Sequence, residues 1–186
     1  VITKIDGNKM TIKLGEEYSE KDKVEILGKF IASLDGLTSV EITDDSILCK
    51  TKDGKGFAIK FGKDFLSEEH INDVVSAFIG NEEDVKSIKV GKEKITLIKE
   101  VEKGKTEEIE IKLNKDIKEE KIIDIMQHGL ADRIDEKTTA KIKDNIISYS
   151  LKDKKTLMVE VDKDFSKTSL DKLQDVDKIR KLKEED

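Results

Sequence analysis

Acidic residues recur at one position of a repeated pattern in this sequence. Glu17, Asp64, Asp116 and Asp164 each follow an alternating apolar stretch and precede a run with helical spacing. A carboxylate in such a place could bind a cation or act as a general base. Catalytic groups converge in one cleft, however, and these acids lie about 50 residues apart. We therefore interpret them as acids that favour the positive end of a following helix dipole.

A run of acids between Asp162 and Asp175 raises the question of a calcium-binding loop. An EF-hand loop that starts at Asp162 needs glycine at its sixth position and glutamate at its twelfth. Lys167 and Leu173 stand at these positions. Because the match fails, we interpret these acids, and the pair Asp44-Asp45, as ordinary surface residues.

The remaining candidates for metal binding or nucleophilic chemistry are isolated from one another. His70 and His128 are the only histidines and Cys49 is the only cysteine, whereas a metal site needs several converging ligands. Gly54-Lys55-Gly56 lies between two strand-like stretches, although a phosphate-binding loop leads from a strand into a helix. We expect both histidines on helix surfaces and Cys49 as a small buried residue. The sequence thus predicts no catalytic residue, no cofactor-binding residue and no metal ligand, and hence a protein that is not an enzyme and has no cofactor.

The charge balance narrows the choice of partners. Charged residues make up 42% of the sequence and hydrophobic ones 35%, and 36 basic against 42 acidic residues give a net charge of -6. Nucleic acids and anionic membranes attract a cationic face, which this balance disfavours. The arginine fork that recognises phosphate groups occurs only at Arg133 and Arg180. Since no apolar run approaches the roughly 20 residues that cross a bilayer, we expect no nucleic-acid partner and no membrane insertion.

One short sequence pattern, called the phrase below, occurs four times and divides the chain into similar segments. Aligned on the last apolar residue before it, the copies stand at Leu14, Phe61, Leu113 and Val161. Ahead of the phrase, alternating residues flank a turn signal such as Asp53-Gly54, which is typical of a hairpin. After the phrase the apolar period changes to about 3.6, which predicts a helix. The helical stripes are Val24, Leu27, Ile31 and Leu34; Ile71, Val74, Val75 and Phe78; Ile122, Ile125, Met126 and Leu130; and Leu170, Leu173 and Val176.

The corner between the last strand and the helix has a residue pattern of its own. Ser19, Ser67 and Ser166 stand where an N-cap hydroxyl would accept an amide hydrogen bond. Tyr18, Phe65, Ile117 and Phe165 are placed to act as a hydrophobic staple on the first helical turn. Gly15, Gly62 and Asn114 are predicted to occupy equivalent corner positions. Folding requirements alone account for these residues.

A third strand precedes the hairpin in the later units, at Val40-Glu41-Ile42, Ile88-Lys89-Val90 and Ala140-Lys141-Ile142. The predicted fold class is therefore α+β, as tandem repeats of an antiparallel three-stranded meander plus one covering helix (βββα units). The predicted boundaries are 1–38 for a first ββα unit entered partway, 39–84 for the second, 85–136 for the third, and 137–186 for the fourth with a charged C-terminal tail. Two arrangements are open: a rod in which each unit contacts its neighbours, or pairs of units merged into two pseudo-symmetric domains.

The segment from Thr11 to Leu37, TIKLGEEYSEKDKVEILGKFIASLDGL, resembles segments of clostridial S-layer and cell-wall surface proteins, in particular the low-molecular-weight S-layer subunit. In that family too a short hairpin strand ends in a Gly-acid-apolar-Ser/Glu corner before a helix, and the composition is Lys-rich and nearly free of Cys. The resemblance implies a protein that works through its surfaces. It carries no functional residue over to this chain.

These observations predict a non-enzymatic structural or binding module of a bacterial surface protein, either S-layer or adhesin-like. Its expected partners are other protein domains or subunits of a surface assembly. The chain starts at Val1 without Met, which favours part of a longer secreted chain with flanking domains, located outside the cell or in the cell wall. The alternative is an intracellular protein-binding regulator or inhibitor from a phage or an AT-rich bacterium, located in the cytoplasm.

Overall fold

A computed structural model describes residues 2–6, 9–12, 20–34, 36–43, 46–54, 56–60, 68–82, 84–113, 117–151 and 155–184. The strands are β1 (Ile2–Asp6), β2 (Lys9–Ile12), β3 (Leu37–Ile42), β4 (Ser46–Thr51), β5 (Gly56–Lys60), β6 (Val85–Val90), β7 (Lys94–Glu102), β8 (Lys105–Leu113), β9 (Thr139–Lys143), β10 (Ile146–Ser150) and β11 (Thr156–Val161). The helices are α1 (Glu20–Ala32), α2 (Glu68–Asn81), α3 (Glu119–Ala131), α4 (Lys167–Gln174) and α5 (Val176–Glu184).

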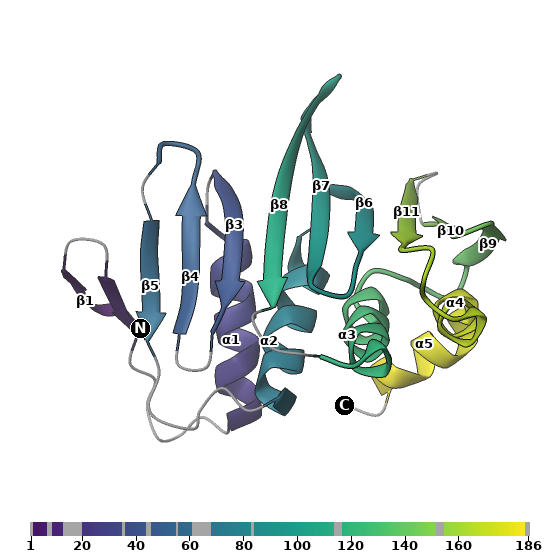
Figure 1. The fold of residues 1–186 in the computed structure, drawn as a ribbon, viewed down its shortest axis with the longest axis horizontal. Coiled ribbons are helices and arrows are strands. Elements are labelled where there is room, and N and C mark those ends of the chain that lie inside the picture. The colour runs from purple at the N-terminus through teal and green to yellow at the C-terminus, as the bar shows by residue number, and fades with distance from the viewer. Residues whose placement is uncertain are drawn as a thin grey trace.

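The strands form one mixed sheet in the order β1-β2-β5-β4-β3-β8-β7-β6-β11-β10-β9, which runs from left to right in Figure 1. Consecutive strands pair antiparallel within three groups, β3 to β5, β6 to β8 and β9 to β11. Parallel pairs join these groups, β3 with β8 and β6 with β11. A further parallel pair, β2 with β5, attaches the N-terminal hairpin. The antiparallel groups are therefore continuous with one another.

The predicted tandem βββα repeats are wrong. Each such unit would have a sheet of its own, with a free edge on either side that carries unpaired amide and carbonyl groups. The parallel pairs of β3 with β8 and of β6 with β11 satisfy these groups within the chain. The fold is consequently neither a rod of separate units nor two merged domains, but one mixed sheet with helices packed against it.

Within the part of the chain that the structure describes, helices cover one face of the sheet. Along β8, for example, Ile109, Ile111 and Leu113 are buried whereas Glu108 and Lys112 are exposed. The buried side chains of the strands belong to one core cluster together with apolar residues of the helices. The helices lie side by side, α1 against α2, α2 against α3, and α3 against α4 and α5. Figure 1 shows α1 behind β3. The molecule thus has two layers, and the uncovered side of the sheet is called the open face below.

Small residues set the distances between the first three helices. A Cβ added to Gly28 of α1 would stand 2.4 Å from the Cβ of Ala77 in α2. A Cβ added to Gly129 of α3 would stand 2.9 Å from the Cγ2 of Ile79. The Ser76 hydroxyl of α2 also donates a 3.1 Å hydrogen bond to a main-chain carbonyl of α3. The helical layer is therefore packed at backbone contact, without room for larger side chains.

The corner predictions are only partly within the described residues. The Ser166 N-cap is confirmed, because its hydroxyl accepts a hydrogen bond from the amide of Ser169 at the start of α4. Phe165 is buried, and Ile117 is partly buried against the core. The predictions for Gly15, Tyr18, Ser19, Gly62, Phe65, Ser67 and Asn114 concern positions outside the described residues.

Both arginines of the sequence hold loops that lead into strands. Arg133, after the end of α3, donates to the carbonyls of Glu82 and Val85, where the chain passes from α2 to β6. Arg180 of α5 donates at 2.8 Å to the carbonyl of Asp135 and to two carbonyls near it, where the chain passes from α3 to β9. A guanidinium fork can reach several carbonyls at once, which the ammonium group of lysine does less well. The two arginines thus fix two equivalent helix-to-strand connections.

Gly28→Ala is expected to destabilise the fold. Within a helix, alanine normally stabilises the fold by about 1 kcal/mol relative to glycine. A decrease in stability would therefore show that the steric clash outweighs helix propensity, and an increase would show the opposite. The clash with Ala77 should prevail and lower the free energy of unfolding by about 1–3 kcal/mol in urea denaturation. Lys29→Ala, at the exposed neighbouring position, is the control and should change it by less than about 0.5 kcal/mol. A stabilised Gly28→Ala protein would contradict this account of the helical layer.

Arg133→Lys tests the role of the guanidinium fork at constant charge. The lysine can keep at most part of the bonding to the α2–β6 connection, so the free energy of unfolding should fall by about 1–2 kcal/mol. Amide hydrogen exchange between residues 82 and 85 should become faster. Lys121→Arg, on the exposed side of α3, is the matched control. Equal stability of Arg133→Lys and the unchanged protein would show that the fork contributes nothing.

Candidate functional site

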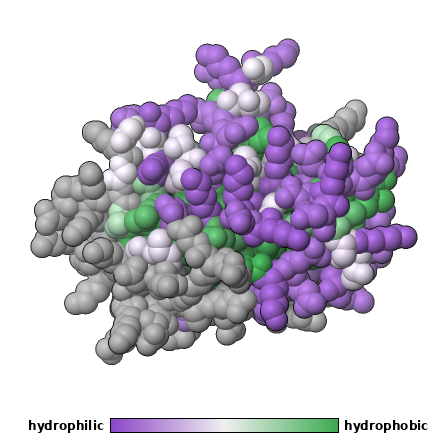
Figure 2. Space-filling view, viewed as in Figure 1, coloured by the Kyte–Doolittle hydropathy of each residue, from purple (hydrophilic) through white to green (hydrophobic). Residues whose placement is uncertain are grey.

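The open face carries positively and negatively charged side chains, and two apolar residues, Ile98 and Met158, lie among its polar residues. Two neighbouring rows of residues that pair across the strands define it: Ser39, Glu110, Thr96, Lys89 and Glu160 in the first, and Glu108, Ile98, Ser87, Met158 and Ser148 in the second. Ile98 is partly exposed and Met158 is 42% exposed. In the view of Figure 1, hydrophilic residues cover much of the described surface, with smaller hydrophobic areas between them (Figure 2). Such a face suits contact with another molecule of mixed charge.

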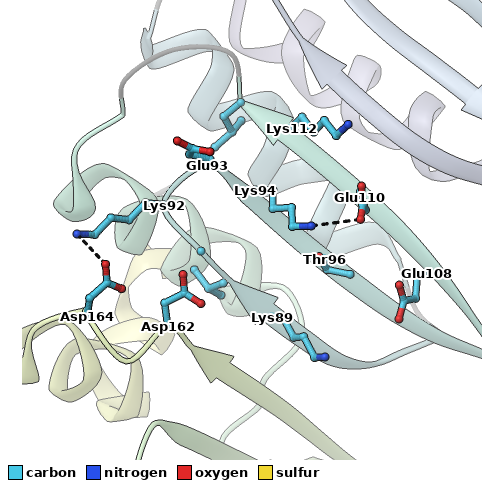
Figure 3. A pocket seen from close by; sticks show the side chains of 13 residues that line it. Lys89, Lys92, Glu93, Lys94, Thr96, Glu108, Glu110, Lys112, Asp162 and Asp164 are labelled. Carbon is cyan, nitrogen blue, oxygen red and sulfur yellow. Dashed lines mark hydrogen bonds and ion pairs between the residues drawn. The ribbon is translucent and has the colours of Figure 1, made fainter.

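A hollow of about 1010 Å³ lies on the open face, where β6, β8 and β11 end (Figure 3). These strands run in the same direction, and the carboxyl ends of parallel strands are a common place for ligand sites. Lys92 of the β6–β7 turn lies 3.1 Å from Asp164, which follows β11. Lys94 of β7 lies 3.4 Å from Glu110 of β8. The hollow therefore brings together charged residues from distant parts of the sequence.

The hollow gathers carboxylates from three segments: Glu93 from the β6–β7 turn, Glu108 and Glu110 from β8, and Asp162 and Asp164 from the turn after β11. A pair of carboxylates can act as general acid and base, but the acid needs an environment that raises its pKa. The side chain of Glu110 is 36% exposed and that of Asp164 63% exposed, and each has a lysine partner. Hydrated, ion-paired carboxylates fit the recognition of a charged surface better than proton transfer.

One of the four recurrent acids of the sequence, Asp164, lies within the described residues. Asp164 lies in the hollow, paired with Lys92, ahead of the first turn of α4. The other three recurrent acids, at 17, 64 and 116, and the pair at 44 and 45 fall outside the described residues. The interpretation of the recurrent acids as helix-entry acids therefore stays a prediction for those positions.

The predicted environments of Cys49 and of the histidines are confirmed. Cys49 is 1% exposed, and burial raises the pKa of its thiol to about 12, so the thiolate that a nucleophile needs is disfavoured. His70 and His128 are partly exposed on different helices, α2 and α3. The His128 Nδ1 lies 2.9 Å from the carbonyl oxygen of Asp124. Among the described residues no cluster of His, Cys, Asp or Glu side chains could hold a metal ion.

Sequence reasoning missed an ion pair between the buried Glu82, which directly follows α2, and Lys99 of β7. Glu82 is 3% exposed, and its Oε2 lies 2.9 Å from the Lys99 Nζ. Burial raises the pKa of Glu82, while Lys99 acts in the opposite direction. Lys99 follows Ile95 and Leu97 at every second position of β7, which places it on the buried side and could have revealed the pair. The pair lies outside the hollow and joins two structural elements, so we assign it a structural role.

A second network missed by sequence reasoning joins the starts of α3 and α4. The Glu119 carboxylate accepts hydrogen bonds from the Ser169 hydroxyl at 2.6 Å, the Ser166 hydroxyl at 2.8 Å and the Ser166 amide at 3.3 Å. The bonds from Ser169 and Ser166 lower the pKa of Glu119. Because the Ser166 hydroxyl donates its hydrogen bond to the carboxylate, the lone pairs of the Ser166 oxygen can accept a hydrogen bond from the Ser169 amide. Glu119 thus supports the N-cap of α4.

Comparisons with known proteins give no information about the role of the hollow. No protein-family model matches the chain, and neither a curated protein nor a solved structure is significantly similar to it. The resemblance of the segment from Thr11 to Leu37 to S-layer proteins stays a prediction. Among the described residues, no helix combines the length and the apolar composition that a transmembrane span requires.

Glu119→Gln is expected to lower stability in a pH-dependent way. A carboxylate whose pKa is lower in the folded chain stabilises it above the unfolded pKa of about 4.3, and this stabilisation is lost as the pH falls through the folded pKa. The variant should therefore unfold more easily at neutral pH, and the difference from the unchanged protein should shrink below about pH 4. Denaturant titrations between neutral and acidic pH measure this. Glu120→Gln, at the exposed next position, is the control, and a difference that stays constant with pH would contradict the account.

Proposed function

We propose that this chain is a non-enzymatic binding module of a bacterial surface protein, and that its open face contacts a protein subunit of the same surface assembly. The observation that carries the proposal is the presence of two exposed or partly exposed apolar residues, Ile98 and Met158, on either side of Ser87 in the second row of the open face, next to the charged residues of the first row. Protein interfaces commonly have an apolar centre that excludes water and a polar rim. The open face likewise combines apolar and charged residues on a rigid sheet.

The kind of partner follows from the charges. Lys92, Lys94, Glu110 and Asp164 form ion pairs across the hollow, so neither sign dominates there. A polyanion such as nucleic acid needs an excess of cations, whereas a protein with both charges on its surface can match this mosaic and gain specificity from it. A protein subunit is therefore the partner that the charges favour.

The placement in a surface assembly rests on the resemblance of the segment from Thr11 to Leu37 to clostridial S-layer proteins. A subunit that assembles through its surface needs a contact face of sufficient area. A continuous sheet backed by a helical layer supplies one, since the strands hold their side chains in fixed rows. The hydrated carboxylates of the hollow agree with a role in contact.

The test measures binding of the purified chain to S-layer protein extracted from a clostridial cell surface, by biolayer interferometry. Ile98→Asp and Met158→Asp place a charge at an apolar position of the open face and should weaken binding at least about tenfold. Lys121→Glu, on the exposed side of α3, changes charge outside the open face and should bind like the unchanged chain. Circular dichroism checks that each variant is folded.

Two outcomes would overturn the proposal. One is binding that the open-face variants leave unchanged. The other is turnover of cell-wall material by the chain that Glu110→Gln abolishes, which would make the hollow a catalytic site.

A further inference from the structure

The strand β9 forms one end of the sheet. It pairs antiparallel with β10, and the sheet order places no strand on its other side among the described residues. Amide and carbonyl groups along a free strand edge are a ready template for another extended segment. The question is whether β9 is a protected end or an unfilled position.

The other two strands that begin an antiparallel group supply the comparison. Ile42 of β3 pairs with Ile47, Val90 of β6 with Ile95, and Ile142 of β9 with Ile147. The three strands are therefore equivalent in register within their groups. In β3 and β6 the outer edge is filled by a parallel strand, β8 or β11. Among the described residues, no strand fills the equivalent edge of β9.

The free edge leaves an apolar side chain uncovered. Ile42 is 2% exposed and Val90 1%, whereas the equivalent Ile142 is 36% exposed. Ile142 pairs with the fully buried Ile147 and so belongs to the helix-covered face. The difference in exposure corresponds to the parallel strand that β3 and β6 have and β9 lacks.

There is room for the side chains of an added strand. A hollow of about 550 Å³ adjoins the start of β9 on the side of α4 and α5. Thr139 and Ala140 of β9 line it together with Asp171, Gln174 and Val176 of the two helices. Its lining also includes Glu136, Lys137, Asp175, Asp177 and Arg180. The hollow therefore leaves space for a segment beside β9, but it is polar, unlike the core that the apolar residues of β8 and β11 enter.

The charged residues of β9 indicate what kind of segment could pair with its free edge. At the middle of the junction between β6 and β11, Lys89 faces Glu160. The equivalent residue of β9 is Lys141, which is exposed, and Lys143 follows it. Antiparallel pairing of β9 with a second copy of itself would set these lysines against one another, which is unfavourable. An acidic residue between two apolar ones, as in Val159-Glu160-Val161, is the complementary pattern.

We propose that the outer edge of β9 is a docking site for an extended segment of another protein, which adds to the sheet as a parallel strand. Its pattern is apolar, acidic, apolar, with the acid facing Lys141 and the flanking apolar residues covering Ala140 and Ile142. This site is a strand edge at the end of the sheet, where Lys141 pairs with Ser148 of the open face, and the proposal does not depend on the function proposed for that face.

The test uses the intact chain and a fluorescent peptide with the sequence of residues 155–162, KTLMVEVD. The peptide should bind, and a peptide with Glu160→Lys should bind roughly three- to tenfold more weakly, as expected from exchanging an attractive cross-strand pair for a repulsive one. The Lys141→Glu chain should reverse this preference and bind the lysine peptide better. That reversal also shows that the variant is folded. Lys121→Glu is the control on the chain and should leave the preference unchanged.

Hydrogen exchange locates the binding. Amides of Thr139–Lys143 should become protected in the complex, while those of Val85–Val90 should keep their protection. Three results would overturn the proposal: no reversal of the peptide preference, loss of protection in β6 because the peptide replaces β11, or concentration-dependent dimers of the free chain that Ile142→Lys abolishes. The last result would identify a second copy as the occupant.

Discussion

Pairing of strand edges is the constraint on which the rest of this structure depends. An antiparallel group of three strands has two edges, and a group of that size with one helix buries little apolar surface. The parallel pairs of β3 with β8 and of β6 with β11 turn the separate groups into one sheet. The helices can then pack side by side into one layer, where Gly28 and Gly129 allow backbone contact. Edge pairing thus makes a continuous core possible.

The open face follows from how these parallel strands are covered. Parallel sheets usually have helices on both faces, and their strands are apolar almost throughout. In β3 the residues Val40 and Ile42 are buried while Ser39 and Glu41 are partly exposed, which is the alternation of a sheet covered on one face. The crossing connections therefore keep all helices on one side. This leaves the opposite side, with its mosaic of lysine and glutamate, available for contact.

Local features of the fold could be predicted from the sequence, because apolar spacing is set within each element. Leu27 and Ile31 of α1 and Leu130 of α3 are buried as the helical spacing predicts. The last predicted stripe is interrupted at Asp175, which separates α4 from α5. The joining of the groups was missed because it depends on residues far apart in sequence. The hollow was missed for the same reason, since Lys92 and Asp164 become neighbours only when β6 and β11 pair.

Charged residues help to select which strands pair across the antiparallel groups, whereas apolar spacing does not distinguish between the possible partners. Glu41 of β3 faces Lys112 of β8, and Lys89 of β6 faces Glu160 of β11, at equivalent positions of the two junctions. The apolar residues on either side are nearly interchangeable, so burial alone would let β11 pair with β3. That exchange would set Glu41 against Glu160 on the partly solvated face, where like charges directly opposite are unfavourable. Each pair contributes little stability, but the difference between attraction and repulsion at two junctions favours one order of the groups over the other. The charges of the open face thus help to specify the fold as well as to present a surface.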